Sequence, residues 1–308
     1  MDHTPFLVLP NTRIYLKDYD PGFTGKYKNK ESAEKKLKKN IKRLRGFQEI
    51  LWAQSKYSLL LVFQGMDTAG KDSTVKFVMT GINPMGCRVV SFKTPSTEEL
   101  KHDYWWRCYK NLPERGQIGI FVRSHYEEVI VVRVHPEILD KQNIPAEVRP
   151  VNVWENRFET FNNFERHLAE NGTIILKFFL NISKGEQKER FFDRINRPEK
   201  NWKFSMNDIK ERGHWDDYMR AYEEAISKTS TSLAPWYIIP ADHKWFTRAA
   251  VSNIINTKLK SLNLSYPAMS PEEHKKNLLA LTTALKNEEK VFPAVASRKT
   301  QPSAEAVK

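Results

Sequence analysis

Five short apolar runs recur along the chain, and they predict five buried strands. The runs are residues 57–63, 88–92, 118–122, 173–180 and 236–239. Their near-continuous apolar character is typical of strands that are covered on both faces. Helical patterns separate the runs, and this alternation favours an α/β fold with a parallel sheet and helices on both faces.

An amphipathic helix is expected before the first strand. Its apolar side chains recur at spacings of three, four or seven, at Ala33, Leu37, Ile41, Leu44 and Leu51. Residues 26–45 also hold eight lysines and two arginines against two glutamates. Two interpretations stay open: a docked helix whose lysines face solvent, or a lysine face that attracts a polyanion.

Three further helical segments carry start signals or periodicity. Ser96 and Glu99 have the spacing of a capping box ahead of a helix, and residues 155–168 form an amphipathic stretch. Residues 183–228 are charged and mostly helical. Pro271 after Ser270 begins a last helix, and beyond about residue 291 the chain is polar without periodicity, which predicts a disordered tail.

Neither an internal repeat nor a glycine-rich linker divides the sequence, so we expect one catalytic core with appendages. The expected parts are an N-terminal extension with the basic helix (1–56), the core (57–264), and a C-terminal helix with its tail (265–308).

Composition narrows the class of protein. At 40% hydrophobic and 12% aromatic residues, the 308-residue chain can bury a core, which excludes global disorder. Two cysteines, Cys87 and Cys108, exclude a disulfide framework or a four-thiolate metal site and suit a reducing cytoplasm. We expect neither a membrane span nor a secretory signal, because the apolar runs are short and the first ten residues lack a basic start. The net charge of +13 leaves nucleic acid, an anionic membrane or an acidic substrate as partners.

A candidate phosphate-binding loop directly follows the first predicted strand. Gly65 and Gly70 lie five residues apart and precede Lys71, which matches the glycine–lysine part of such loops. Backbone N–H groups and the start of the next helix would surround phosphate oxygens, and Lys71 would add a mobile charge. The candidate phosphate-binding residues are Gly65, Met66, Thr68, Ala69, Gly70, Asp72 and Ser73.

Two carboxylates distinguish this loop from the usual one. Asp72 stands where Ser or Thr normally follows the lysine, with Ser73 one position later, and Asp67 lies inside the loop. Carboxylates so placed suit Mg²⁺ held between phosphate groups, with Mn²⁺ as the alternative ion. Asp72 has a second interpretation as a favourable charge at the helix start.

The end of the third predicted strand contributes Val122, which cannot bind a metal, and Arg123. Beside a phosphate loop, a bidentate phosphate contact is the favoured role of Arg123. His125 is expected to be a structural histidine. Further along, Arg190, Arg194 and Arg197 share a helix face, either as a salt-bridged solvated face or as part of a lid over the loop.

Five motifs in order resemble the family-2 polyphosphate kinases. They are GMDTAGKD, FKTPSTEELKHDYWWR, RSHYEEVIVVRVHP, ERGHWDDYMRAYEEAI and PWYIIPADHKWFTR. The resemblance covers about residues 18–264 and is greatest for the short subgroup that phosphorylates both AMP and ADP.

This resemblance implies a thymidylate-kinase-like, three-layer α/β/α sandwich with a mostly parallel sheet and a helical lid at about 183–215. It implies reversible, Mg²⁺-dependent transfer of the terminal phosphoryl group of inorganic polyphosphate to AMP and ADP, in a cytoplasmic homo-oligomer, dimer or tetramer. Asp67 would act on the metal and acceptor phosphate, Lys71 on the phosphoryl in flight, and Arg123 on phosphate. The residues expected to line the polyphosphate channel are Arg190, Arg194, Arg197 and Lys200.

Two positions depart from the family pattern: Val122 stands where Asn or Asp is expected, and Trp105 where a smaller apolar residue is expected. The alternatives are an ATP-dependent nucleoside-monophosphate kinase, against which Asp72 argues, and a basic nucleic-acid-binding module. No zinc-finger, helix-turn-helix or RNP pattern supports the latter.

Overall fold

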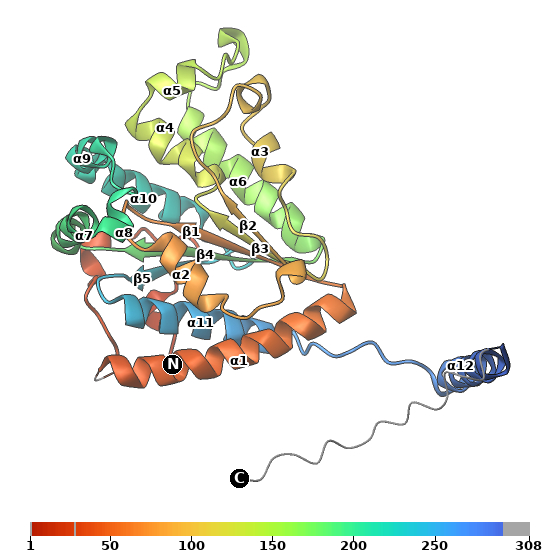
Figure 1. Ribbon diagram of the computed structural model, residues 1–308. Coiled ribbons are helices and arrows are strands. Elements are labelled where there is room, and N and C mark those ends of the chain that lie inside the picture. The colour runs from red at the N-terminus through yellow and green to blue at the C-terminus, as the bar shows by residue number, and fades with distance from the viewer. Residues whose placement is uncertain (1, 28, 292–308) are drawn as a thin grey trace. The chain divides into compact units, whose positions relative to one another are not determined.

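The computed structural model describes residues 2–27 and 29–291 (Figure 1). The tail expected beyond Val291 lies outside these residues. Within them the chain divides into two compact units, one ending at Ser265 and one beginning at Tyr266.

A five-stranded parallel sheet forms the centre of the first unit. The strands are β1 (Ser58–Gln64), β2 (Cys87–Ser91), β3 (Ile118–Val122), β4 (Thr173–Asn181) and β5 (Trp236–Pro240), in the order β2-β3-β1-β4-β5. Each of the five apolar runs became one of these strands, so the parallel α/β fold is confirmed. The expected burial is wrong for β2, whose residues are partly or fully exposed because it is the edge strand next to β3. The register pairs Phe63 with both Val122 and Phe178, which brings the carboxyl ends of β1, β3 and β4 together.

Helices cover both faces of this sheet (Figure 1). The longer helices of the first unit are α1 (Lys30–Gln54), α2 (Lys71–Val78), α6 (Val153–Glu170), α7 (Lys184–Asn196), α9 (Met206–Gly213), α10 (Trp215–Thr229) and α11 (Lys244–Lys260), and α12 (Pro271–Val291) belongs to the second unit. The short ones are α3 (Trp106–Tyr109), α4 (Val131–Val134), α5 (Glu137–Asp140) and α8 (Pro198–Asn201). The 3-10 turns are η1 (Thr4–Phe6), η2 (Leu16–Asp18), η3 (Pro84–Gly86), η4 (Glu99–Lys101), η5 (His125–Val129) and η6 (Ala146–Val148).

The layers follow from the contacts between these elements. Helix α11 packs against β4, β5 and α2, and α1 lies along α11, whereas α6 packs on β4 and α10 on α6. This is the expected three-layer α/β/α arrangement. Segments α7, α8 and α9 follow β4 and stand at the carboxyl ends of the strands (Figure 1).

The basic helix α1 is a docked helix whose lysines are largely exposed. Leu37 and Leu44 are buried as expected, while Ile41 is only partly buried. The docked face also contains polar residues that a hydrophobic pattern does not identify. Asn40 donates to the Ser252 hydroxyl at 3.0 Å, and its carbonyl accepts from Asn256 at 3.1 Å, both on α11.

The capping box at Ser96 forms, but the expected helix does not. The Ser96 N–H donates to Glu99 at 2.8 Å and the Glu99 N–H donates to the Ser96 hydroxyl at 3.2 Å, yet only the 3-10 turn η4 follows. The reason is local, since the Asp103 carboxylate accepts from the Trp105 N–H at 2.8 Å and begins a new turn.

The second unit contains α12, which begins as expected. The Ser270 N–H and the Glu273 carboxylate lie 3.1 Å apart, and the Glu273 N–H donates to the Ser270 hydroxyl at the same distance. Among the described residues, no helix has the length and apolar character needed to cross a lipid bilayer.

Candidate active site

The glycine–lysine loop connects β1 to α2, as its position in the sequence predicts. Gly65 has φ 148°, and a Cβ there would lie 2.8 Å from the Leu180 carbonyl oxygen. Gly70 has φ 103°. Both positions require glycine because L side chains rarely adopt such φ values and, at Gly65, because β4 lies too close.

The ammonium group of Lys71 points back into this loop. Its Nζ donates to the carbonyls of Gly65 at 2.5 Å and Met66 at 3.2 Å. Burial, together with the Arg123 charge, lowers the pKa of Lys71 to about 8, although Asp67 opposes the shift. The loop therefore holds a desolvated cation where an anionic ligand would stabilise its charge.

Arg123 comes to the same place from the end of β3. Its backbone adopts φ 63°, unusual for a residue with a side chain, while its N–H donates to the Phe63 carbonyl at 2.9 Å. The guanidinium Nη2 lies 3.5 Å from Asp67 Oδ1. Val122, one residue earlier, is only 2% exposed and belongs to the hydrophobic core.

A cleft of about 310 Å³ opens over the loop. Eight cationic side chains line it: Lys71, Arg123, Arg190, Arg194, Lys200, Lys203, Lys244 and Arg248. The acidic ones are Asp67, Asp72 and Asp193, and Thr68, Gly70 and Ser73 complete the lining. So strong an excess of positive charge in a concave site favours a polyanionic ligand.

The segment expected to act as a lid supplies several of these cations. Arg194 pairs with Asp208 at 3.2 Å, and Lys200 pairs with Asp193 at 2.6 Å. Burial, and then the charge of Asp67, raises the pKa of Asp208, which places this lid carboxylate within electrostatic reach of the loop.

Arg197 and Arg190 depart from the expected arrangement. Arg197 is half exposed, pairs with Glu199 at 2.5 Å and is absent from the residues that line the cleft. Its geometry is that of the salt-bridged surface face considered above. Arg190 is only 5% exposed, and protein oxygen atoms accept hydrogen bonds from all three of its guanidinium nitrogens.

Sequence reasoning missed three cations of the cleft and one carboxylate. Lys203, Lys244 and Arg248 were not among the expected site residues, although the last two lie four residues apart at the start of α11 and so share a helix face. Burial raises the pKa of Glu127, and Arg123 and Lys71 oppose that shift, so its carboxylate belongs to the same charge cluster.

The donor set fits a hard divalent cation. The Asp67 side chain is 30% exposed, and both it and Asp72 open onto the cleft. No cluster of three metal-ligating side chains is found among the described residues. Mg²⁺ does not need one, because it is commonly held by one or two carboxylates together with substrate phosphates and water.

His125 is buried among aromatic rings, as expected of a structural histidine. Its ring centroid lies 4.6 Å from that of Trp105 and 4.8 Å from that of Phe161. Burial lowers the pKa of His125, which favours the neutral imidazole. Trp105, which departs from the family pattern, is thus part of the packing around this histidine.

Comparison with known proteins gives a consistent family. The family model described as polyphosphate kinase 2 matches residues 27–267. An ADP-polyphosphate phosphotransferase of Rhodopseudomonas palustris is 49% identical over 82% of this chain and 88% of its own length. An AMP/ADP-polyphosphate phosphotransferase of Meiothermus ruber is 44% identical over 85% of this chain and 94% of its own length.

A solved structure agrees with these relatives. The crystal structure of polyphosphate kinase 2 from Arthrobacter aurescens superposes with a TM-score of 0.78 at 39% identity, and the match covers 87% of this chain and 93% of that one. Residues 27–267, which the family model matches, contain the phosphate loop, the segment expected to act as a lid and the start of α11. The chain therefore belongs to the polyphosphate kinase 2 family.

Proposed function

We propose that this protein transfers the terminal phosphoryl group of inorganic polyphosphate to AMP and ADP, reversibly, giving ADP and ATP. The cationic cleft over the phosphate loop is the observation that carries the proposal, because a long inorganic polyanion matches the excess of positive side chains that line it. The named activities of the relatives, on ADP and on AMP/ADP, support the same reaction.

In the proposed mechanism, catalysis comes from positioning and charge neutralisation, without a covalent enzyme intermediate. The bond between the last two phosphates breaks while a bond to an acceptor phosphate oxygen forms. Lys71 would leave the Gly65 and Met66 carbonyls and contact the transferring phosphoryl group. Arg123 would grip the adjacent phosphate, and Arg194, Lys200 and Lys244 would hold the rest of the chain.

Asp67 and Asp72 would hold Mg²⁺, with Mn²⁺ as the alternative ion. When bound, the ion neutralises charge on the phosphate oxygens. Asp67 itself has a second task, since its ion pair with Arg123 orients that guanidinium toward the loop.

Three properties complete the proposal. The two free thiols, Cys87 and Cys108, suit a cytoplasmic protein. The family resemblance favours a homo-oligomer, dimer or tetramer. Eight cationic side chains line a cleft over the phosphate loop, and this concave arrangement favours polyphosphate over nucleic acid or a membrane surface as the partner.

A donor–acceptor matrix tests this function. Purified protein is given polyphosphate with AMP, polyphosphate with ADP, or ATP with AMP, and the nucleotides are separated by chromatography. We expect product in both polyphosphate reactions. Turnover only with ATP as donor would instead identify a nucleoside-monophosphate kinase.

A gel-shift experiment addresses the nucleic-acid alternative. Non-specific contacts to nucleic acid are strongly screened, so we expect no shift of DNA or RNA at ~150 mM salt. Retained binding at that salt concentration would favour the nucleic-acid-binding module.

A further inference from the structure

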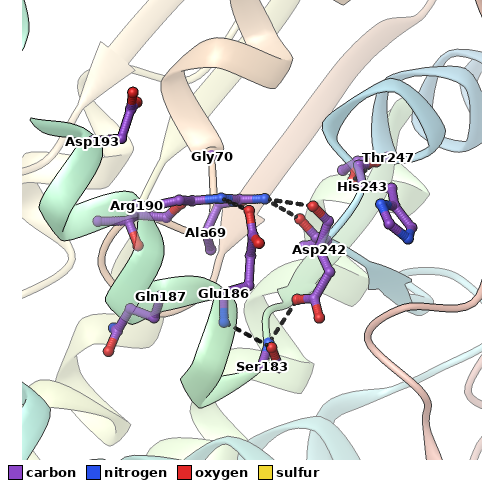
Figure 2. Close-up of polar contacts among 12 residues, drawn as sticks. Ala69, Gly70, Ser183, Glu186, Gln187, Arg190, Asp193, Asp242, His243 and Thr247 are labelled. Carbon is purple, nitrogen blue, oxygen red and sulfur yellow. Dashed lines mark hydrogen bonds and ion pairs between the residues drawn. The ribbon is translucent and has the colours of Figure 1, made fainter. Parts of the chain in front are cut away.

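All hydrogen-bond donors of the Arg190 guanidinium, on α7, bond to protein oxygen atoms. Its Nε donates to Glu186 at 2.8 Å; Nη1 donates to the carbonyls of Thr68 at 2.8 Å and Ala69 at 3.1 Å; Nη2 donates to those of Ala241 at 2.6 Å and Asp242 at 2.9 Å. These five bonds match the five N–H donors of a guanidinium. Figure 2 shows the group lying between Ala69 and Asp242, with Glu186 beside it.

Helix α7 holds three successive carbonyls of the phosphate loop. Gln187 donates to the Asp67 carbonyl at 3.1 Å, and Arg190 donates to the next two. In a planar trans peptide the C=O and the following N–H point in opposite directions. Fixing the Asp67 and Ala69 carbonyls toward α7 therefore directs the N–H groups of Thr68 and Gly70 away from it.

The other side of the guanidinium is anchored to the turn between β5 and α11. The Ala241 N–H donates to the Asn181 carbonyl at 2.9 Å, and the Asp242 carboxylate accepts from the Ser183 N–H at 2.8 Å. Ser183 caps α7, so this turn is fixed both to β4 and to the helix that carries Arg190. Arg190 thus ties the loop to a rigid part of the sheet.

We propose that Arg190 is a positioning residue, which fixes the loop backbone so that its N–H groups meet the phosphates, and that it does not itself bind polyphosphate. The kinetic part of this proposal rests on the proposed function; the backbone part does not. Thr68, held at φ 63° with its carbonyl on Arg190, is the point at which release of the loop would begin.

Arg190→Lys separates the two roles. Lysine keeps the charge but carries its donors on one atom, so it cannot span the Thr68 and Asp242 carbonyls at once. A polyphosphate ligand would be largely rescued by lysine. For a positioning residue we expect kcat to fall ~10–100-fold, with the KM for polyphosphate and its salt dependence unchanged. Arg220→Lys, at an exposed arginine of α10, is the matched control and should behave as the unaltered protein.

Hydrogen exchange without any substrate tests the backbone role independently of activity. In Arg190→Lys the amides of residues 67–70 should exchange faster, while those of β1 and α6 stay protected. If that variant does not fold, Glu186→Gln is the milder test, because it weakens the ion pair that holds the Arg190 guanidinium. It should show the same faster exchange of the loop amides and a smaller loss of kcat.

Two results would overturn the proposal. One is an unaltered exchange of the loop amides, and the other is an unchanged kcat with a raised, more salt-sensitive KM for polyphosphate. If the unaltered protein lacks polyphosphate-dependent activity, but the loop amides still exchange faster in Arg190→Lys than in the unaltered protein, only the proposed function is refuted.

Discussion

Lys71 and Asp67 concentrate opposite charges in a loop that the backbone carbonyls partly enclose. The ammonium group is desolvated and bonded to two carbonyls, whereas the carboxylate is one-third exposed and paired with Arg123. At the scale of single residues, the site is therefore a set of charges held ready for a ligand that brings its own negative charge.

Removing either charge should abolish most activity without unfolding the protein. We expect Lys71→Met and Asp67→Asn each to lower polyphosphate-dependent ATP formation by ~10²–10³, the usual loss when one such electrostatic contact is removed. Lys76→Met, at an exposed lysine of α2, is the matched control. Near-full activity of either site variant, with a normal circular dichroism spectrum, would refute the site assignment.

The pH dependence should report the desolvated lysine. Because burial lowers the pKa of Lys71 to about 8, the free protein loses this positive charge above that pH, whereas an ordinary lysine would keep it. We expect kcat/KM for polyphosphate to be level below about pH 8 and to fall ~tenfold per unit above it. A profile that stays level through this range would contradict the role of Lys71. The kcat profile should begin to fall at a higher pH than the kcat/KM profile, because the bound polyanion stabilises the ammonium group of Lys71.

At the scale of elements, a buried polar network joins β4 to α6 and α10. Lys177, which is fully buried, donates to Glu165 at 2.5 Å, to the Tyr126 hydroxyl at 2.9 Å and to the Thr229 carbonyl at 2.7 Å. Tyr126 also donates to Glu165 at 2.9 Å. This network lies behind η5 and so supports the turn that follows Arg123.

Breaking this buried ion pair from one side should be costly. We expect Glu165→Leu to lower the free energy of unfolding by ~3–5 kcal/mol, since it leaves an uncompensated buried ammonium group. Glu165→Leu combined with Lys177→Met should recover much of that loss, as urea denaturation would measure. The control is the exposed pair of Lys228 and Glu155, for which Glu155→Gln should cost less than ~1 kcal/mol. If Glu165→Leu lowered the free energy of unfolding as little as Glu155→Gln does, the charge of Lys177 would not depend on Glu165 for compensation.

At the scale of the whole molecule, the described residues that line the cationic cleft and those of the hydrophobic core lie in the first unit. The buried members of the hydrophobic core run from Phe6 to Leu259, and the family match ends at residue 267. Helix α12 lies beyond that match and exposes Leu278, Leu279, Leu281 and Leu285. Among the described residues, the hydrophobic core of the first unit has no member from the second unit.

A chain that ends at Ser265 should therefore keep the activity and the melting temperature of the full chain. The comparison needs steady-state kinetics, thermal unfolding and light scattering on both proteins. Lost activity with a changed number of subunits would show that residues after Ser265 contribute to assembly. Lost activity with the same number of subunits would place a functional residue among them.

Much of the fold follows from local pattern. Buried parallel strands need continuous apolar runs, so the central strands were identifiable, and the exposed edge strand β2 was found through its two valines. The glycine–lysine loop was identifiable because Gly65 and Gly70 are required by their φ values. The α1 face was only partly predictable. Asn40 is buried there because Ser252 of α11 accepts its hydrogen bond, and no periodicity of α1 alone contains that partner.

By itself, the sequence determined which segments form the strands, the position of the phosphate loop, and the candidate site residues Asp67, Lys71 and Arg123. Tertiary structure alone decided which lid arginine does what. Arg190, Arg194 and Arg197 have the same chemistry and helical spacing. Arg190 and Arg194 both line the cleft, but Arg190 donates to loop carbonyls and Arg194 pairs with Asp208, whereas Arg197 pairs with Glu199 at the surface. The reason is physical: a guanidinium's role depends on which acceptors surround it, and those of Arg190 come from residues about 50 and 120 positions away along the chain.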